Sequence, residues 1–400
     1  MEFHFKDEVV HAKKAAMGEM YRLAKENLKK DEHLINFASG HPDTGIFQDQ
    51  MIEQYVTKAL RQGNKELLQY GPHLGIESLR QQFKRFANAR GTVVKEEDDI
   101  MITYGNTEGI YLAGCVLLNR GDKVILEEPS YVNAIKAFQL LGAELTSVLQ
   151  DPDGVNLEEL EKEMKKGAKI YYTIPNFSNP SGITMSEEKR KAVYALAVKY
   201  DVVIVEDNTY GDLRYRGERI KNIKEYDTTG NVIYLSTMSK VVAPAMRIGF
   251  MAADTTFLQK AAVVKAVSTN GVTPILQKAL CLMFEENDMY QEIEKICRGY
   301  SHKLYAMEDS MRQFFPETVQ FSNPDGGMFI WATMPEGSDV IDFCRKSAKQ
   351  LHIPITPGNG FCLQNADNCS SMRFNFVKER VEDIQYGIEK VGKMMKEYLS

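Results

Sequence analysis

Short β-branched runs alternate with longer helical patterns between residues 98 and 252. The runs read IMITY, KVILEE, AELTSVL, KIYYTIP, DVVIVED, NVIYLS and RIGFMAA, and patterns such as EEKRKAVYALAVKY separate several of them. This alternation is typical of parallel strands that are joined by crossover helices. We therefore expect a large α/β domain built on a doubly wound, mostly parallel sheet.

The pattern changes after residue 254. Helical stretches are predicted at about 255–285 and 288–314, followed by a strand (GGMFIWAT), a helix near 338–350, a second strand (SMRFNF) and a closing helix from residue 379. These elements predict a second, smaller α/β domain. The segment KKAAMGEMYRLAKENLKK at 13–30 predicts an amphipathic helix, which we expect to join the smaller domain.

The chain contains no internal repeat and no Pro-rich or Ser-rich linker that would mark a domain boundary. We therefore place the domain boundaries where the pattern of predicted elements changes. The expected parts are an N-terminal segment that joins the small domain (1–45), the large domain (46–285) and the small C-terminal domain (286–400).

Composition narrows the class of protein. Of the 400 residues, 44% are apolar and 26% are charged, which is ordinary for a globular protein. The net charge of −6 offers no electrostatic footprint for nucleic acid. The start, MEFHFKDEVV, lacks the basic and then apolar order of a signal peptide, and no run of about 18 apolar residues occurs. We therefore expect neither export by that route nor a membrane-spanning segment.

The cysteines indicate the cellular setting. They are dispersed, with no C-x-x-C pair and no zinc-like spacing with histidine, so we expect no metal site and a reduced, cytoplasmic environment. The six are Cys115, Cys281, Cys297, Cys344, Cys362 and Cys369.

Polar residues follow the predicted strands at the edge where open α/β sheets bind ligands. A small turn, Gly105-Asn106-Thr107, opens a helix and offers backbone N–H groups to an anion. The other strand ends supply an amide, a carboxylate, an amine, a guanidinium, hydroxyl groups and aromatic rings. These residues are Tyr131, Asn179, Asp207, Tyr210, Thr237, Ser239, Lys240 and Arg247.

Each of these residues has an ordinary structural interpretation when it is taken alone. Tyr131 could simply pack at the sheet edge, Asp207 could cap the next helix, and Lys240 could be a solvated surface lysine. Together they match the needs of one cofactor. Pyridoxal phosphate requires a lysine for a Schiff base, a carboxylate for its pyridine nitrogen and an anion site for its phosphate.

Five motifs carry a resemblance to a known family. They are N-P-S-G (179–182), E-D-N-x-Y (206–210), S-T-M-S-K-x-x-A-P-x-x-R (236–247), Y-G-P-x-x-G-x-x-x-L-R (70–80) and M-R-F-N-F (372–376). With these motifs, which occur in the family's order along the chain from about residue 35 to the C-terminus, the chain resembles the fold-type I, pyridoxal 5'-phosphate-dependent aminotransferases of class I/II. It is most similar to the 2-aminoadipate and kynurenine aminotransferase branch.

The resemblance implies a role for each matching residue. Lys240 would form the Schiff base, Asp207 would pair with the pyridine nitrogen, Asn179 and Tyr210 would contact the ring oxygen, and Tyr131 would stack on the ring. Arg373 would bind the substrate α-carboxylate, beside space left by Gly40. Residues expected around the phosphate are Gly105, Asn106, Thr107, Thr237, Ser239 and Arg247, together with Tyr70 from the other subunit of a homodimer.

Two segments depart from the pattern of this branch. The phosphate turn of this branch usually reads Gly-Ser-Gln-Gln, whereas residues 105–108 read Gly-Asn-Thr-Glu here. The last of these, Glu108, brings a negative charge near an anion site. The segment ITPGNGFC at 355–362 replaces a bulkier Pro-Gly-Ser turn and bears on the shape of the substrate pocket.

The predicted function is transamination between an L-amino acid and a 2-oxo acid by a ping-pong mechanism. Two alternatives keep the cofactor: a β-lyase, and an amino-acid sensor like the domains fused to winged-helix regulators. Only one helix is predicted before the motif region, which leaves no room for a winged-helix domain.

Two further alternatives find little support. A nicotinamide oxidoreductase would need G-x-G-x-x-G, which does not occur, and the S-x-x-K string at Ser186 is better explained as a helix cap. Which amino acid is used stays open, because Arg22 and Lys14, the candidate cations for a second carboxylate, are expected on a solvated helix face.

Overall fold

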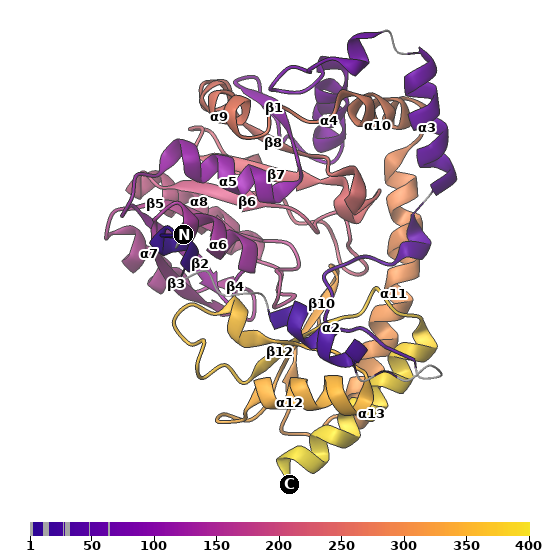
Figure 1. Ribbon diagram of the computed structural model, residues 1–400. Coiled ribbons are helices and arrows are strands. Elements are labelled where there is room, and N and C mark those ends of the chain that lie inside the picture. The colour runs from indigo at the N-terminus through magenta and orange to yellow at the C-terminus, as the bar shows by residue number, and fades with distance from the viewer. Residues whose placement is uncertain (1–2, 11–15, 27, 29–32, 48, 63–64) are drawn as a thin grey trace.

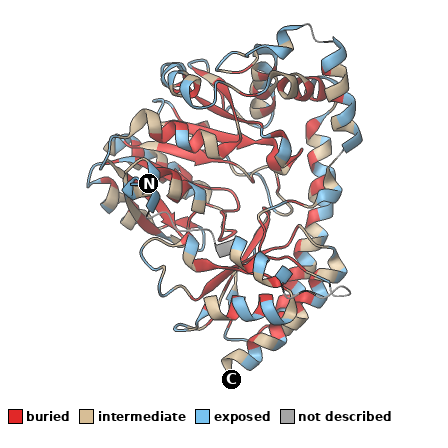
Figure 2. Cartoon of the chain, viewed as in Figure 1, coloured by how far each residue is buried: buried red, intermediate tan, exposed pale blue. Residues whose placement is uncertain are grey.

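The computed structural model describes residues 3–10, 16–26, 28, 33–47, 49–62 and 65–400. Two β-sheets organise this part of the chain, an eight-stranded sheet and a four-stranded sheet (Figure 1). The strands of both sheets are largely buried beneath helices (Figure 2). None of the described helices is long and apolar enough to cross a membrane.

The large sheet has the order β1-β8-β7-β6-β5-β2-β3-β4, and β3, β2, β5, β6 and β7 run parallel. The strands are β1 (Asp98–Thr103), β2 (Lys123–Glu128), β3 (Glu144–Asp151), β4 (Gly154–Val155), β5 (Ala168–Thr173), β6 (Val203–Asp207), β7 (Val232–Thr237) and β8 (Gly249–Asp254).

One strand runs against the predicted direction. The prediction counted RIGFMAA among the parallel strands, yet β8 pairs antiparallel with both β7 and β1. Only the short segment between Thr237 and Gly249 joins β7 to β8, and it contains two 3₁₀ turns instead of a crossover helix. A parallel pairing requires such a crossover, so the short link imposes the antiparallel one.

Helices cover both faces of the large sheet. Residues of α5 (Asn106–Leu117), α6 (Val132–Leu140) and α9 (Thr255–Ser268) contribute to one apolar core, and those of α7 (Leu157–Met164) and α8 (Glu187–Tyr200) to another. Along β5, Ile170 and Tyr172 belong to the first core and Tyr171 to the second, as the two-residue period of a strand requires. The predicted doubly wound arrangement is confirmed.

The small sheet is antiparallel, with the order β11-β12-β10-β9. Its strands are β9 (Gln320–Phe321), β10 (Phe329–Thr333), β11 (Thr356–Pro357) and β12 (Ser371–Asn375). The helices around it are α2 (Ala16–Glu26), α11 (Met289–Phe314), α12 (Val340–Lys346) and α13 (Val381–Leu399). The short α1 (Asp7–Val10) contacts α6 instead.

The helix predicted over 13–30 is present as α2, which contacts β11 and α12. Residues 13–15, 27, 29 and 30 of that prediction lie outside the described residues. The exact domain boundaries at 45 and 285 stay a prediction.

The single helix predicted over 255–285 is wrong, because a turn divides it into α9 and α10 (Pro274–Glu286). Asn270 and Gly271 have φ angles of 55° and 96°, and Pro274 starts α10, so the backbone cannot continue as one helix. The turn packs against the segment after Tyr70: the His73 ring lies 3.3 Å from the Asn270 side chain. Two further helices, α3 (Asp49–Gln62) and α4 (Glu77–Asn88), pack against α10.

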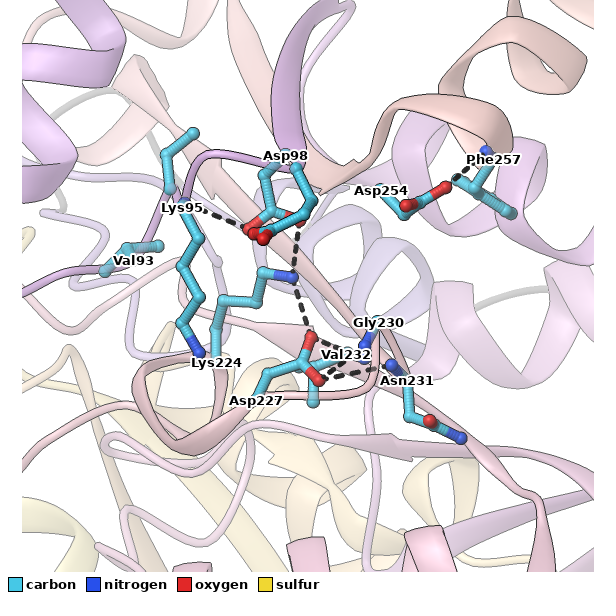
Figure 3. Close-up of polar contacts among 12 residues, drawn as sticks. Val93, Lys95, Asp98, Lys224, Asp227, Gly230, Asn231, Val232, Asp254 and Phe257 are labelled. Carbon is cyan, nitrogen blue, oxygen red and sulfur yellow. Dashed lines mark hydrogen bonds and ion pairs between the residues drawn. The ribbon is translucent and has the colours of Figure 1, made fainter.

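A buried ionic cluster supports the far end of the large sheet (Figure 3). The Lys224 ammonium group lies 2.9 Å from Asp98 and 2.8 Å from Asp227. Asp227 also accepts hydrogen bonds from the backbone N–H groups of Gly230, Asn231 and Val232. Because one ammonium group and several backbone N–H groups together satisfy the two carboxylates, the cluster has a structural explanation.

Candidate active site

Twelve of the predicted site residues line one cavity of about 440 Å³ beyond the carboxyl ends of the parallel strands. They are Gly40, Asn106, Thr107, Tyr131, Asn179, Asp207, Tyr210, Thr237, Ser239, Lys240, Arg247 and Arg373. The structure therefore brings together residues that are separated by as many as 333 positions in the sequence. Gly105 borders the cavity through its contact with Arg247.

Lys240 ends a 3₁₀ turn (Met238–Lys240) directly after β7, and its side chain enters the cavity. Its ammonium group donates to the Gly40 carbonyl at 3.0 Å. Burial, together with the Arg373 and Arg247 guanidinium groups, lowers the pKa of Lys240 to about 8. The lowered pKa makes the uncharged amine, the form that acts as nucleophile and base, easier to reach near neutral pH than for an ordinary lysine.

Asp207 is the last residue of β6 and is 1% exposed. One carboxylate oxygen accepts from the Asn106 amide at 2.6 Å and the Thr209 hydroxyl at 2.7 Å, and the other accepts from Tyr172 at 2.8 Å. Burial raises the pKa of Asp207, while these hydrogen bonds oppose the rise. The carboxylate is held in one orientation, suited to pairing with a cationic ring nitrogen.

Asn106 differs in part from its predicted role. It was expected beside the phosphate, but its side-chain amide is directed to Asp207 and Thr209. Its backbone remains in the first turn of α5, where N–H groups are available to an anion. Asn106 therefore connects the turn Gly105-Asn106-Thr107 to the Asp207 carboxylate.

The proposed anion site combines the turn Gly105-Asn106-Thr107 with the guanidinium of Arg247. Gly105 caps α5 with a φ of 74°, and a Cβ at this position would lie only 2.9 Å from the Arg247 guanidinium. That guanidinium donates to the Tyr104 carbonyl at 2.7 Å. Thr237 and Ser239 add hydroxyl groups that lie 3.0 Å apart. A helix N-terminus, a guanidinium and two hydroxyl groups together suit a phosphate.

The negative charge of Glu108, the departure from the family pattern, is compensated within the protein. Its carboxylate pairs with the fully buried Lys265 at 2.5 Å and accepts from the Thr269 hydroxyl at 2.7 Å. It also accepts from the Tyr104 backbone N–H, just before the N-cap residue Gly105, at 2.7 Å. Glu108 therefore stabilises the start of α5 without leaving an unpaired charge beside the proposed anion site.

Replacing Glu108 by Ala is expected to lower the free energy of unfolding by about 3–5 kcal/mol, because Lys265 would remain buried and unpaired. Thermal and denaturant unfolding of the variant and the wild type measure the effect. The control is the double variant Glu108→Gln with Lys265→Met, which should regain most of the lost stability. An unchanged unfolding midpoint in the single variant would contradict the buried pair.

Asn179 and Tyr210 lie side by side at the cavity, with the amide 3.4 Å from the phenol oxygen. Burial raises the pKa of Tyr210 far above its ordinary value, so the phenol stays protonated and can donate. The Tyr131 hydroxyl accepts from Asn133 at 3.0 Å. These three side chains supply an amide, a phenol donor and an aromatic ring at one place.

Arg373 lies in the middle of β12 and is 4% exposed. Its guanidinium donates to the Asn179 side chain at 2.8 Å and the Ala38 carbonyl at 3.0 Å, and it lies 4.1 Å from the centre of the Phe329 ring. Burial lowers the pKa of Arg373 to about 10, so it remains a cation at neutral pH. A fixed, buried guanidinium suits a carboxylate ligand.

Of the remaining wall, only the segment at 355–362 was connected with the substrate pocket in the sequence. This wall comes from one face of α6, from β10, from β11 and the loop that follows it, and from single residues after β5 and β6. Its residues include Val132, Asn133, Ile135, Lys136, Gln139, Ile174, Thr209, Phe329, Thr356, Pro357, Asn359, Gly360, Phe361, Cys362, Leu363 and Ala366. On α6, the spacing of Val132, Ile135 and Gln139 marks a single helical face, and this signal was available in the sequence.

Several other candidates lie away from this cavity. Tyr70 is 81% exposed and does not line it. Arg22 pairs with Glu26 at 2.6 Å on the exposed side of α2, and Lys14 lies outside the described residues. Ser186 caps α8 by accepting from the Lys189 N–H, which confirms the helix-cap interpretation.

Comparison with known proteins identifies the family. The model for "Aminotransferase class I and II" matches residues 32–391. The aromatic-amino-acid aminotransferase 1 of Thermococcus litoralis is 35% identical over 404 residues, which cover 99% of this chain and 95% of the relative.

Two solved structures agree over nearly the whole chain. They are the multiple substrate aminotransferase of Thermococcus profundus and the kynurenine aminotransferase of Pyrococcus horikoshii. Each matches with a TM-score of 0.93 and 31% identity, and covers 99% of this chain and 98% of its own.

The chain belongs to the class I and II aminotransferases. It is a transaminase of PLP fold type I, and its cofactor is pyridoxal 5'-phosphate. The predicted fold class, cofactor and reaction are confirmed.

Proposed function

We propose that this aminotransferase takes L-amino acids with large apolar side chains, aromatic ones included, as amino donors. One observation carries the proposal: beyond Arg373, the cavity is walled by Ile174, Phe329, Phe361 and Leu363. An apolar wall favours an apolar side chain because burial removes that side chain from water. The names of the relatives from Thermococcus litoralis and Pyrococcus horikoshii, which specify aromatic amino acids and kynurenine, agree with this proposal.

The residues of the cavity fit pyridoxal phosphate. Lys240 offers an amine of lowered pKa, and Asp207 offers a fixed carboxylate for the ring nitrogen. The proposed anion site at Gly105 and Arg247 would hold the phosphate, with Thr107, Thr237 and Ser239 beside it. Asn179 and Tyr210 would hold the ring oxygen and Tyr131 would lie on the ring. The cofactor supplies an electron sink for the pair left when the α-proton departs.

The protein's own side chains then orient the substrate and move the proton. Arg373 would hold the α-carboxylate by two parallel hydrogen bonds, which turns the α-carbon toward Lys240. The Lys240 amine would accept the α-proton and, once protonated, would serve as the acid for the second proton transfer. Hydrogen bonds from three side chains, Asn106, Thr209 and Tyr172, favour the charged form of Asp207 and hold it in one orientation.

We also propose a homodimer with shared sites. Tyr70, the family's phosphate-binding tyrosine by motif, is 81% exposed and lies away from the cavity of its own chain. Such a position lets it reach a neighbouring protomer. A reduced, cytoplasmic setting is part of the same proposal, supported by six cysteines that all lack disulfide bonds.

The absorbance of the purified enzyme tests the proposed function. Aromatic and large aliphatic amino acids should bleach the visible cofactor band, and a 2-oxo acid should restore it. Alanine and aspartate are the controls for small and acidic side chains. A preference for either control would contradict the proposed substrate class, and release of pyruvate and ammonia without an oxo acid would indicate a β-lyase.

A further inference from the structure

Glu128 is a buried carboxylate outside the catalytic constellation. It is the last residue of β2 in the large sheet and is 6% exposed. Taking an ionised carboxylate out of water is costly unless hydrogen bonds compensate it. The compensation here comes largely from a segment 236 positions away in the sequence.

That segment is the loop between the 3₁₀ turn Gly358–Phe361 and β12, which belongs to the small sheet. The Glu128 carboxylate accepts from the backbone N–H of Asn365 at 2.8 Å and from that of Gln364 at 3.1 Å. The Ser147 hydroxyl donates to the same carboxylate from β3. One side chain therefore holds two consecutive peptide groups of the loop.

Two more hydrogen bonds attach the loop to the large sheet. The Ser130 N–H donates to the Phe361 carbonyl at 2.8 Å, and the Gln364 side chain donates to the Ser147 carbonyl at 3.2 Å. The neighbouring Glu127 differs, because its carboxylate is satisfied by side chains of the large sheet alone. Among these adjacent carboxylates, only Glu128 connects the two sheets.

The loop held by Glu128 is a wall of the substrate cavity. Phe361, Leu363 and Ala366 line the cavity on either side of the two clamped peptide groups. The Phe361 ring centre lies 5.0 Å from the Arg373 guanidinium and 5.8 Å from the Trp331 ring. A shift of the clamped peptides would therefore move the surface that faces the substrate side chain.

We propose that Glu128 is a positioning residue that sets the side-chain preference of the cavity by fixing this loop. The inference rests on the proposed function, since it assigns the loop to the substrate side chain. Glu128 does not touch the reacting atoms. Its effect on kcat/KM is greatest for amino-acid donors whose side chains contact the wall and least for a small donor such as alanine.

Replacing Glu128 by Gln tests the proposal in the holoenzyme. The glutamine keeps one acceptor oxygen and places an NH₂ group opposite the second N–H, so one hydrogen bond to a charged group is lost. We expect kcat/KM to fall about tenfold for large apolar donors, chiefly through KM, and by less than about twofold for alanine. The cofactor absorbance should not change.

Gln364→Ala is the matched control. It removes only the side-chain bond to Ser147 and leaves both backbone N–H groups on Glu128, so its donor preference should change less than that of Glu128→Gln. Equal losses for all donors in Glu128→Gln, or no loss for any, would overturn the proposal. A wild type that prefers small or acidic donors would overturn the proposed function instead.

Hydrogen exchange on the wild-type holoenzyme provides a test that does not depend on a variant folding. The Gln364 and Asn365 amides should exchange more slowly than the Asp367 amide of the same loop. Equally fast exchange at all three positions would show that the clamp is not formed.

Discussion

Lys240→Ala should reduce turnover by about 10⁴-fold or more, because in the proposed mechanism the Lys240 amine provides both the attachment of the cofactor and the proton transfer. The variant should also lose the borohydride-stable attachment of the cofactor to the protein. Half-reaction kinetics, followed by cofactor absorbance, and mass spectrometry after reduction measure the two effects.

Lys136 provides the control for this experiment. It lines the same cavity from α6 but lies outside the proposed reaction centre, so Lys136→Ala should retain the covalent attachment. Transamination by Lys240→Ala at the wild-type rate would refute the assignment of the catalytic lysine.

Arg373→Ala should raise KM about 100-fold for every amino-acid donor, equivalent to about 2.7 kcal/mol of lost binding. The reason is geometric: the α-carboxylate is common to all donors, and no other guanidinium lies with Asn179 at this side of the cavity in the described structure. Steady-state kinetics across aromatic, aliphatic and small donors measure the change.

Arg373→Lys distinguishes charge from geometry. Lysine keeps the positive charge but cannot form two parallel hydrogen bonds, so an intermediate KM is expected. Retained cofactor absorbance would show that both variants are folded. A loss confined to one class of donor would identify Arg373 as a reader of the side chain instead of the carboxylate.

Much of the large domain and of the reaction centre could be predicted because their signals are local. Asp207, Tyr131 and Lys240 each follow a recognisable strand, and parallel strands end at one edge of a sheet. The position of Tyr172 beside Asp207 could have been predicted by the same reasoning. It pairs with Val205 in the neighbouring strand, so it shares a face with Asp207 two residues further on.

The segment at 355–362 was expected to shape the substrate pocket, but its position could not be predicted in the same way. The loop at Phe361 has no strand or helix period, and its position depends on Glu128, a residue of the other sheet. The turn between α9 and α10 was missed for a different reason. The polar run Ser-Thr-Asn-Gly at 268–271, followed by Pro274, is a local turn signal that the prediction passed over.

This turn has a consequence for the assembled enzyme. The turn packs against His73 and so fixes the segment that carries Tyr70. The Tyr70 side chain lies at the surface and is 81% exposed. In the proposed dimer, Tyr70 completes the phosphate site of the neighbouring protomer, and mass action then couples cofactor affinity to self-association. Dilution of the enzyme would release cofactor, and added cofactor would drive dilute protomers together.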